Sequence, residues 1–444
     1  MKERKISMNP LAQELNESIK KANPHIYDML SNKGKNLYFP KGILSQGAEA
    51  KEKAFKYNAT IGIATENGVP MHLPSIMSYI NLPPHQSLNY AASFGVPKLR
   101  ETWQQLLFYK NPSLVGKKIS LPIVTNAITH GLSVTAEMWI DESDVVLLPD
   151  KIWGNYTLIL TVLHGAQIKQ YGLFSSEGGF NLSGFENSLR EEAKVREKIV
   201  ILLNFPNNPT GYTPTKEEGK RIAEILLHLA EKGTNLVVLL DDAYFGLFYD
   251  DNSMKESLFA LLTGIHPRIM AIKLDGGTKE NYVWGLRVGF ITYGALLKSN
   301  SNNFYDALER KAAGAVRGSI SNSPHLSQSI LLGSLNSENY EKEKEEKFAI
   351  MRKRATRVKE ILTNKKYNDA WDVYPFNSGY FMCLRLRTVD AEELRLHLLN
   401  KYGVGVISLG KVDIRIAFSC VEEEDIQNIF DIIFQAIKDI EEIS

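Results

Sequence analysis

The sequence is poor in several features that would assign a protein to a specialised class. It has two cysteines, Cys383 and Cys420, too few for a disulfide framework, and no Cys/His spacing suggests a zinc site. No segment approaches about 18 uninterrupted apolar residues, and residues 1–30 lack the apolar core and cleavage site of a signal peptide. We therefore expect a cytoplasmic chain with buried free thiols, no metal and no membrane span.

An excess of charge of one sign is also missing. The 52 basic and 51 acidic residues leave a formal net charge of +1. Such a balance creates no long-range field that would gather nucleic acid or an anionic membrane. The expected partners are therefore small molecules and a second copy of the chain.

The length and the order of apolar segments indicate the fold class. A chain of 444 residues, 44% of them hydrophobic, suits a large domain and a smaller one. Strands that read as near-continuous apolar runs between helices are typical of a mostly parallel sheet covered on both faces. We therefore predict an α/β domain with a sheet of the seven-stranded type, whose apolar runs lie at residues 118–126, 144–150, 166–173, 198–206, 235–244 and 268–277.

The segments on either side predict the rest of the organisation. Residues 341–362 are helical in pattern but too charged to be core, so they are interpreted as a connector between domains. Strand-like residues 377–386 and 413–418 and a closing helix predict a smaller α+β domain. The predicted division is an N-terminal arm and part of the small domain at 1–60, a large domain at 61–320, and the small domain at 321–444.

Chemistry-bearing side chains follow the apolar runs, and in parallel α/β sheets ligands bind at the carboxyl ends of the strands. Five neighbouring strand ends offer a helix start, an indole, an amide, a carboxylate with a phenol, and an amine. This set suits a flat aromatic cofactor that carries a phosphate, a ring nitrogen, a phenolic oxygen and an aldehyde. The residues are Asn126, Ala127, Ile128 and Thr129, then Trp153, Asn208, Asp241 with Tyr244, and Thr278 with Lys279.

Several sequence blocks occur in a familiar order. YAASFGVPKLR is followed by NFPNNPTG, DDAYFG, DGGTKENYVWGLRVGF and DIRIAF, with 38 residues between Asp241 and Lys279. A single block such as NNPTG is a common turn, but five in order are specific. From about residue 60 to 420 the chain resembles the class I/II pyridoxal-phosphate aminotransferases, which share the fold of aspartate aminotransferase (fold type I).

The resemblance implies a role for the lysine run. Lys279 would hold the aldehyde of pyridoxal 5'-phosphate as an internal Schiff base and then carry the proton between the substrate Cα and the cofactor. Arg287, the arginine of the G-x-R-x-G pattern, would grip the phosphate. Lys273 is the alternative nucleophile, but it lacks the arginine eight residues later.

Other cofactor contacts follow from the same resemblance. Asp241 would keep the pyridine nitrogen protonated, with Asp242 as the structural alternative. Tyr244 and Asn208 would bind the phenolic oxygen, although Asn208 could equally be a turn residue before a proline. Trp153 would stack on the ring and contact the substrate.

The phosphate would be held at the start of a helix by Ala127, Ile128 and Thr129. Tyr90 corresponds to a tyrosine that reaches the phosphate in the neighbouring subunit, which implies a homodimer with shared active sites. One departure from the family pattern is Gly276, which stands where a phosphate-binding serine is usual, and Thr278 is the candidate replacement.

Substrate contacts are implied for three further residues. Arg415 would bind the α-carboxylate, and Gly62 would line the same pocket. Arg317 matches the arginine that binds the distal carboxylate of dicarboxylic substrates across the dimer. The expected reaction is ping-pong transfer of an amino group from an L-amino acid to a 2-oxo acid, with a possible dicarboxylic preference.

Two other functions remain open on the sequence. The same scaffold serves pyridoxal-phosphate lyases and decarboxylases, because only the groups around the cofactor choose the reaction. The fold also occurs fused to DNA-binding modules in transcription regulators. That interpretation requires a basic N-terminal domain of about a hundred residues, whereas here the resemblance begins near residue 60.

Overall fold

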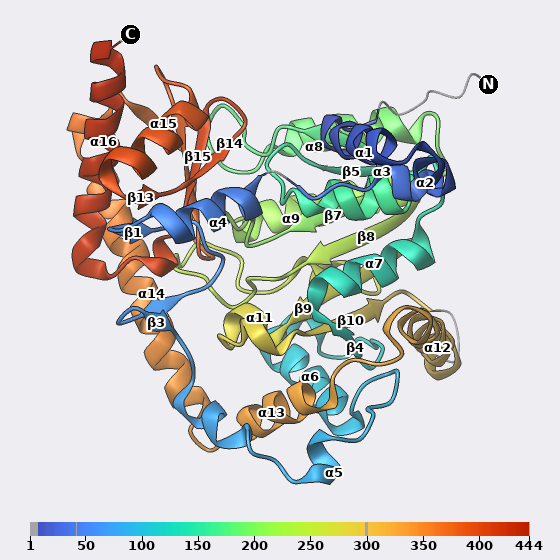
Figure 1. The fold of residues 1–444 in the computed structure, drawn as a ribbon. Helices are drawn as coiled ribbons and strands as arrows, with labels where there is room; N and C mark the ends of the chain where they lie inside the picture. Colours follow the sequence, from blue (N-terminus) through green and yellow to red (C-terminus); the bar gives the residue numbers. More distant parts are fainter. Residues whose placement is uncertain (1–7, 41, 298–300, 444) are drawn as a thin grey trace.

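The computed structural model describes residues 8–40, 42–297 and 301–443. Its main element is a seven-stranded sheet in the order β4, β10, β9, β8, β7, β5, β6 (Figure 1). Neighbouring strands are parallel except for β10, which is antiparallel to β4 and β9. The predicted α/β class is thus confirmed, with strands β4 Ile123–Asn126, β5 Val145–Pro149, β6 Gln167–Tyr171, β7 Lys198–Asn204, β8 Asn235–Asp241, β9 Ile269–Gly276 and β10 Val288–Gly294.

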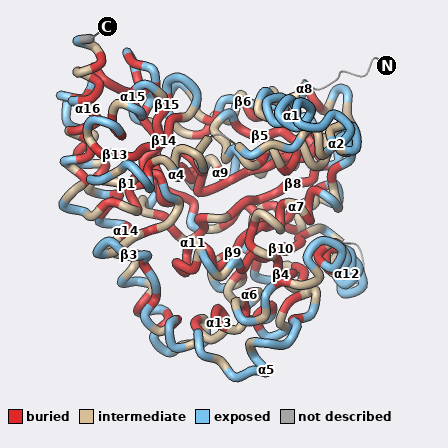
Figure 2. Tube along the Cα trace, in the orientation of Figure 1, coloured by how far each residue is buried: buried red, intermediate tan, exposed pale blue. Residues whose placement is uncertain are grey.

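The strands of this sheet send alternate side chains into two apolar cores. In β8, Val238 and Leu240 belong to one core, and Val237 and Leu239 belong to the other. Most of the strands are buried on both faces, whereas Gln167, Lys169 and Gln170 of the edge strand β6 are exposed; other exposed positions lie mainly on the surrounding helices (Figure 2). The first face is covered by α6 Pro97–Lys110, α8 Leu182–Ala193 and α9 Lys216–Glu231, and the second by α7 Ala127–Trp139, the π-helix η3 Thr157–Leu163 and α12 Ser301–Ile320.

A smaller antiparallel sheet forms the second unit, in the order β11, β12, β15, β14. Its strands are β11 Trp371–Val373, β12 Met382–Leu386, β14 Ile407–Leu409 and β15 Asp413–Ile416, and helices α14 Tyr340–Leu362, α15 Ala391–His397 and α16 Ile426–Ile443 belong to it.

Helix α14 is the charge-rich connector predicted from the sequence, but it is also part of a core. Met351, Ala355 and Val358 are fully buried along it. Their spacing places them on one helical face, which the buried Arg354 shares, whereas Arg352, Lys353 and Arg357 are more exposed. A narrow apolar stripe was hidden in the sequence by the high average charge of the segment.

The N-terminal helices contact both units. Helix α3, Asn32–Asn36, contacts η3 of the large unit, whereas α4, Ile43–Lys53, contacts β14 of the small one. The segment therefore crosses between the units, as expected of an arm, together with α1 Pro10–Ala22 and α2 Pro24–Met29.

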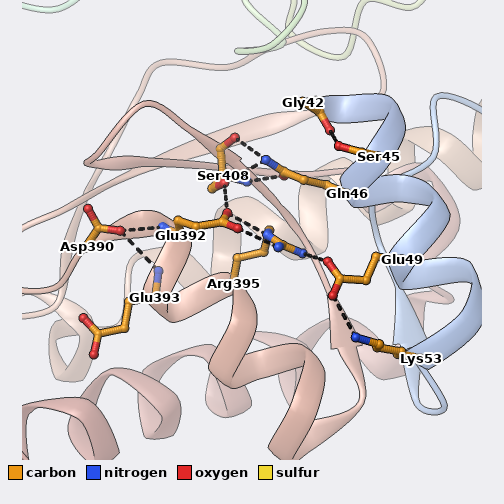
Figure 3. A network of polar contacts seen from close by, with 10 residues as sticks. All are labelled: Gly42, Ser45, Gln46, Glu49, Lys53, Asp390, Glu392, Glu393, Arg395 and Ser408. Carbon is orange, nitrogen blue, oxygen red and sulfur yellow. Dashed lines mark hydrogen bonds and ion pairs between the residues drawn. The ribbon is translucent and has the colours of Figure 1, made fainter. Parts of the chain in front are cut away.

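Helix α4 is fixed to the small unit by a polar network (Figure 3). Gln46 exchanges two hydrogen bonds of 2.9 Å with Ser408, through its side-chain amide and the hydroxyl and backbone N–H of Ser408. Arg395 donates to Glu49 at 2.9 Å, and Glu392 accepts from Ser408 at 2.6 Å. The first residue of α4, Ile43, is thereby held where it lines the cavity described below.

Helix α13, His325–Leu335, packs against α6 and β10 of the large unit. The predicted domain boundaries at residues 60 and 320 stay predictions.

Within the described ranges no helix is long and apolar enough to span a bilayer, and no cluster of His, Cys, Asp and Glu could hold a metal. Both cysteines are free: Cys383 is buried as expected, while Cys420 is only partly buried.

Candidate active site

A cavity of about 250 Å³ lies at the carboxyl ends of the large sheet, where the small unit meets it. All sequence-predicted site residues except Asn126, Tyr90 and Arg317 line it. The lining residues are Ile43, Gly62, Ala127, Ile128, Thr129, Trp153, Tyr156, Asn204, Asn208, Asp241, Ala243, Tyr244, Thr278, Lys279, Arg287, Phe381 and Arg415.

Strand alternation separates Asp241 from Asp242. Because successive side chains of a strand point to opposite faces, the two carboxylates at the end of β8 diverge. Asp241 lines the cavity. Asp242 instead pairs with Lys273 and accepts a 2.6 Å hydrogen bond from Ser257 inside the opposite core. Asp241 is therefore the acid that a ligand in the cavity can reach.

The end of strand β9 separates the two candidate lysines. Lys273 in β9 is fully buried between Asp242 and Asp275, and its amine is committed to these carboxylates. Lys279 lies in the short helix α11, Gly277–Glu280, directly after β9, and lines the cavity. The turn after the strand brings the second amine to the carboxyl edge of the sheet.

The Lys279 amine has a pKa close to neutral pH. Burial first, and then the positive charges of Arg287 and Arg415, lower its pKa to about 7. Its Nζ donates a 2.6 Å hydrogen bond to the carbonyl of Gly62. A Cβ added at Gly62 would lie 3.5 Å from that Nζ, so residue 62 lines the pocket through close backbone approach.

Asp241 is buried and held by three neighbours. The Tyr156 hydroxyl donates to its Oδ2 at 2.5 Å, the Ala243 backbone N–H donates to Oδ1 at 3.1 Å, and Asn204 donates to its backbone carbonyl at 2.8 Å. Burial raises the pKa of Asp241 to about 6, while the bonds from Tyr156 and Ala243 oppose that rise. The carboxylate is therefore oriented, and its charge is sensitive to its hydrogen-bond donors.

Arg415 in β15 brings a cation from the small unit into the cavity. Its Nη1 donates to Asn208 Oδ1 at 3.2 Å, and its Nη2 donates to the Thr60 carbonyl at 2.7 Å. The guanidinium carbon lies 4.1 Å from the ring centroid of Phe381. Its Nε is buried without a hydrogen-bond partner. An incoming carboxylate could satisfy this donor, since a fork of N–H groups suits its geometry.

The other end of the cavity is suited to an anion. Helix α7 begins at Ala127, and its N-cap residue Asn126 makes no side-chain capping bond. A helix start of this kind favours a negative group. Arg287 lines the same end, and the buried Thr278 Oγ1 has no hydrogen-bond partner.

Gly276 cannot simply be replaced by the serine that the family pattern has there. A Cβ at this position would lie 2.5 Å from the Val288 carbonyl oxygen and 3.0 Å from the Gly289 Cα. Such a contact requires the paired strands to shift. The close packing of β9 on β10 therefore accounts for the glycine, and Thr278 supplies the hydroxyl nearest in sequence.

The remaining predicted aromatic residues lie as follows. Trp153 lines the cavity and packs edge-on against Tyr156, with ring centroids 5.6 Å apart. Tyr244 lies 5.2 Å from the Lys279 Nζ, measured to its ring centroid, and burial raises the pKa of its hydroxyl. An indole, a phenol and an amine thus share one space.

Apart from Asn126, the N-cap residue of α7, the predicted site residues that do not line this cavity are Tyr90 and Arg317. Tyr90 is 91% exposed. Arg317 lies in α12, is exposed, and donates to Ser321 Oγ at 2.6 Å. Their predicted roles act across a dimer, so a single chain leaves both roles as predictions.

Five lining residues were not predicted from the sequence: Ile43, Tyr156, Asn204, Ala243 and Phe381. Asn204 ends β7, so the strand-end rule could have found it. Tyr156 follows Trp153 by three residues, directly before a π-helix, a structure frequent at functional sites. Ile43 and Phe381 carry no comparable signal, because distant segments bring them in.

Comparisons with known proteins agree with this arrangement. The sequence pattern of the aminotransferase class I and II family matches residues 76–433. Aspartate aminotransferase of Escherichia coli K12 is 26% identical over 376 residues, which cover 82% of this chain and 90% of that protein.

Solved structures share the fold at low identity. The crystal structure of an aminotransferase from Anaerococcus prevotii has a TM-score of 0.80 and 23% identity, and the match covers 92% of this chain and 99% of that one. Pyrococcus horikoshii kynurenine aminotransferase, solved with PMP, has a TM-score of 0.76 and 18% identity, over 93% of this chain and 98% of that one. With its fold and cavity, the matched family pattern identifies the chain as a member of the class I and II aminotransferases, and hence as a transaminase.

Proposed function

We propose that the protein transfers the amino group of an L-amino acid to a 2-oxo acid by a ping-pong mechanism, with pyridoxal 5'-phosphate held on Lys279. The observation that carries this proposal is the convergence of an amine with a pKa of about 7, a buried carboxylate and a buried guanidinium on one cavity. When bound, the cofactor supplies an aldehyde that condenses with amines and a ring that withdraws electrons from the substrate Cα.

The residues present fit this cofactor. Its phosphate would lie at the start of α7 against Arg287, where the unpartnered Thr278 Oγ1 would gain an acceptor. Its ring nitrogen would meet Asp241, with Trp153 on the ring face. The phenolic oxygen would receive hydrogen bonds from Tyr244 and Asn208, which line the same cavity.

Lys279 has two tasks in this proposal. Its amine would hold the cofactor aldehyde, because a pKa of about 7 leaves the nucleophilic neutral form available near neutral pH. When it is free, the same nitrogen would act as the base that accepts the proton of the substrate Cα and holds it for return. A base with a pKa near the working pH is efficient in both directions.

Arg415 orients the amino acid by its α-carboxylate. The free Nε and the donors left on the terminal nitrogens form a fork beside Phe381. Because Lys279 lines the same cavity, a carboxylate held there would share this space with its amine. The same contact would bind the 2-oxo acid in the second half-reaction.

We further propose a homodimer in which Tyr90 and Arg317 serve the cavity of the partner subunit. Both side chains are exposed and lie outside their own cavity. Tyr90 would donate to the phosphate. Arg317 would bind a distal carboxylate, which favours aspartate and glutamate as donors.

Borohydride reduction of the loaded protein tests the attachment. Peptide mapping should find the reduced cofactor on Lys279, and Lys279→Ala should lose the label and at least about 10³-fold of the activity. The matched control is Lys220→Arg, a surface lysine that should change neither. A label on any other lysine contradicts the proposal.

A donor panel tests the reaction. Every amino acid that the site accepts as a donor should convert the bound cofactor to its amine form, seen by absorbance, and a 2-oxo acid should reverse the change. Ammonia or carbon dioxide released without an acceptor would indicate a lyase or a decarboxylase instead.

A further inference from the structure

Two side chains of strand β15, which belongs to the small unit, contact the large unit. Asp413 and Arg415 are two residues apart, so their side chains point to the same face of the strand. Asp413 Oδ2 accepts from Lys151 Nζ at 2.6 Å, and Arg415 donates to Asn208 at 3.2 Å. The two large-unit partners are themselves adjacent, since Asn207 donates to the Lys151 carbonyl at 3.1 Å.

The Lys151–Asp413 pair is enclosed on several sides. The two side chains are 21% and 8% exposed. Tyr374 donates to Asp413 Oδ1 at 2.9 Å, and its ring lies 5.0 Å from the Lys151 Nζ. Phe174 of the large unit stacks on Tyr374, with centroids 5.6 Å apart. Each carboxylate oxygen therefore has its own donor.

When one partner of an enclosed ion pair is removed, the other charge remains partly buried without a counter-ion, which is not the case for an exposed pair. Although burial lowers the pKa of Lys151, the hydrogen bond and charge of Asp413 raise it above its usual value. Without Asp413, the partly buried ammonium would lose its counter-ion. Removing one partner of an enclosed pair is far more costly than removing an exposed one.

We propose that Lys151 and Asp413 are positioning residues that fix Arg415 for the α-carboxylate of the substrate. This inference rests on the proposed function. The ion pair holds β15 on the large unit at a position two residues from Arg415. The position of the guanidinium relative to Lys279 is thereby fixed. Neither Lys151 nor Asp413 lines the cavity, so they act through Arg415.

The variants separate charge from shape. Asp413→Asn removes the charge and keeps an acceptor for Tyr374, Lys151→Met removes the ammonium, and Lys151→Arg is the conservative rescue. Asp250→Asn is the matched control, because Asp250 pairs with Lys359 of α14, joins the same two units and lies outside the cavity.

For each variant, KM and kcat are measured separately with an amino acid donor and with the corresponding primary amine, which lacks the carboxylate. Asp413→Asn and Lys151→Met should raise KM for the amino acid at least about tenfold, because small displacements of a positioning group are costly. The kcat/KM for the amine should stay within about twofold of wild type, since Arg415 has nothing to bind there. Lys151→Arg and Asp250→Asn should resemble wild type.

Equal losses for the amino acid and the amine would overturn the proposal in favour of a general structural role. Unchanged KM in both variants would overturn it as well. Thermal unfolding of cofactor-free Lys151→Met, Asp413→Asn and the double variant is independent of activity. If the Tm shifts of the two single variants add up in the double variant, the pair does not form and the proposal is overturned. If the wild-type enzyme is inactive on every donor, only the proposed function is refuted.

Discussion

The Tyr156 hydroxyl donates to Asp241 across 2.5 Å, joining the helical turn directly before η3 to the end of β8. Burial raises the pKa of this carboxyl to about 6, and the phenol acts in the opposite direction. A hydrogen bond to the charged form stabilises that form. Tyr156 therefore keeps Asp241 ionised at neutral pH, which is the form that would pair with a protonated ring nitrogen.

Tyr156→Phe should weaken cofactor binding in a pH-dependent way. Without the donor the pKa of Asp241 rises above about 6, so less carboxylate is present near pH 7. A lost hydrogen bond to a charged group corresponds to roughly a tenfold increase in Kd. Titrating cofactor-free protein with pyridoxal phosphate should show a larger deficit at pH 6.5 than at pH 8.5.

The control for this change is Tyr171→Phe, which removes a buried hydroxyl that has no hydrogen-bond partner. It should leave the Kd unchanged. A Tyr156→Phe deficit that is the same at both pH values would mean that the phenol acts by packing alone.

The rate of aldehyde attachment should follow the ionisation of Lys279. Because burial, Arg287 and Arg415 lower the pKa to about 7, the amine is mostly protonated at pH 6 and mostly neutral at pH 8. The rate should therefore rise with pH and level off above pH 8. Pyridoxal without its phosphate is the suitable probe, followed by absorbance in a stopped-flow instrument.

Arg287→Leu should move this profile to higher pH, because a nearby cation disfavours the ammonium form. The probe carries no phosphate, so the loss of a phosphate ligand does not interfere. An inflection near the ordinary lysine value in the wild-type protein would contradict the neutral-amine interpretation.

Lys273→Met should strongly destabilise the protein. Lys273 is fully buried between Asp242 and Asp275, and its loss leaves two carboxylates in an apolar core. Breaking a buried pair in this way costs about 3–5 kcal/mol of the free energy of unfolding. Urea unfolding of the cofactor-free protein measures it, and Lys232→Met on the surface is the control.

The sequence was sufficient to predict the elements that local pattern specifies. The apolar runs predicted the parallel strands, and the strand-end rule led to Trp153, Asn208, Asp241 and Lys279, which meet in the cavity. The period of two along a strand also explains why Asp241 lines the cavity while Asp242 pairs with Lys273 on the opposite face of the sheet. These features depend on neighbours in the chain, and a sequence displays neighbours directly.

Contacts between distant segments could not be predicted in this way. Phe381 and Arg415 stack at 4.1 Å within the small unit, and Ile43 enters from the N-terminal arm. The charge of α14 hid its buried stripe. Arg354 illustrates the difficulty, because it is fully buried and donates to the carbonyls of Thr65 and Ser419, far apart in the chain.

Hybrid dimers provide the final test, that of sharing between subunits. One variant carries Lys279→Ala and is inactive in its own cavity. The other carries Tyr90→Phe and Arg317→Ala. If Tyr90 and Arg317 act across the interface, a mixed dimer contains one cavity with Lys279 from one subunit and both partners from the other, all native.

Unfolding and refolding the two variants together should therefore restore about a quarter of the wild-type activity toward a dicarboxylic donor, since half of the randomly paired dimers are hybrids with one native cavity each. Each variant refolded alone should remain well below that level. If Tyr90 and Arg317 served their own chain, no pairing would assemble a native cavity. The mixture would then show only the mean of the two separate activities, which would refute the shared site.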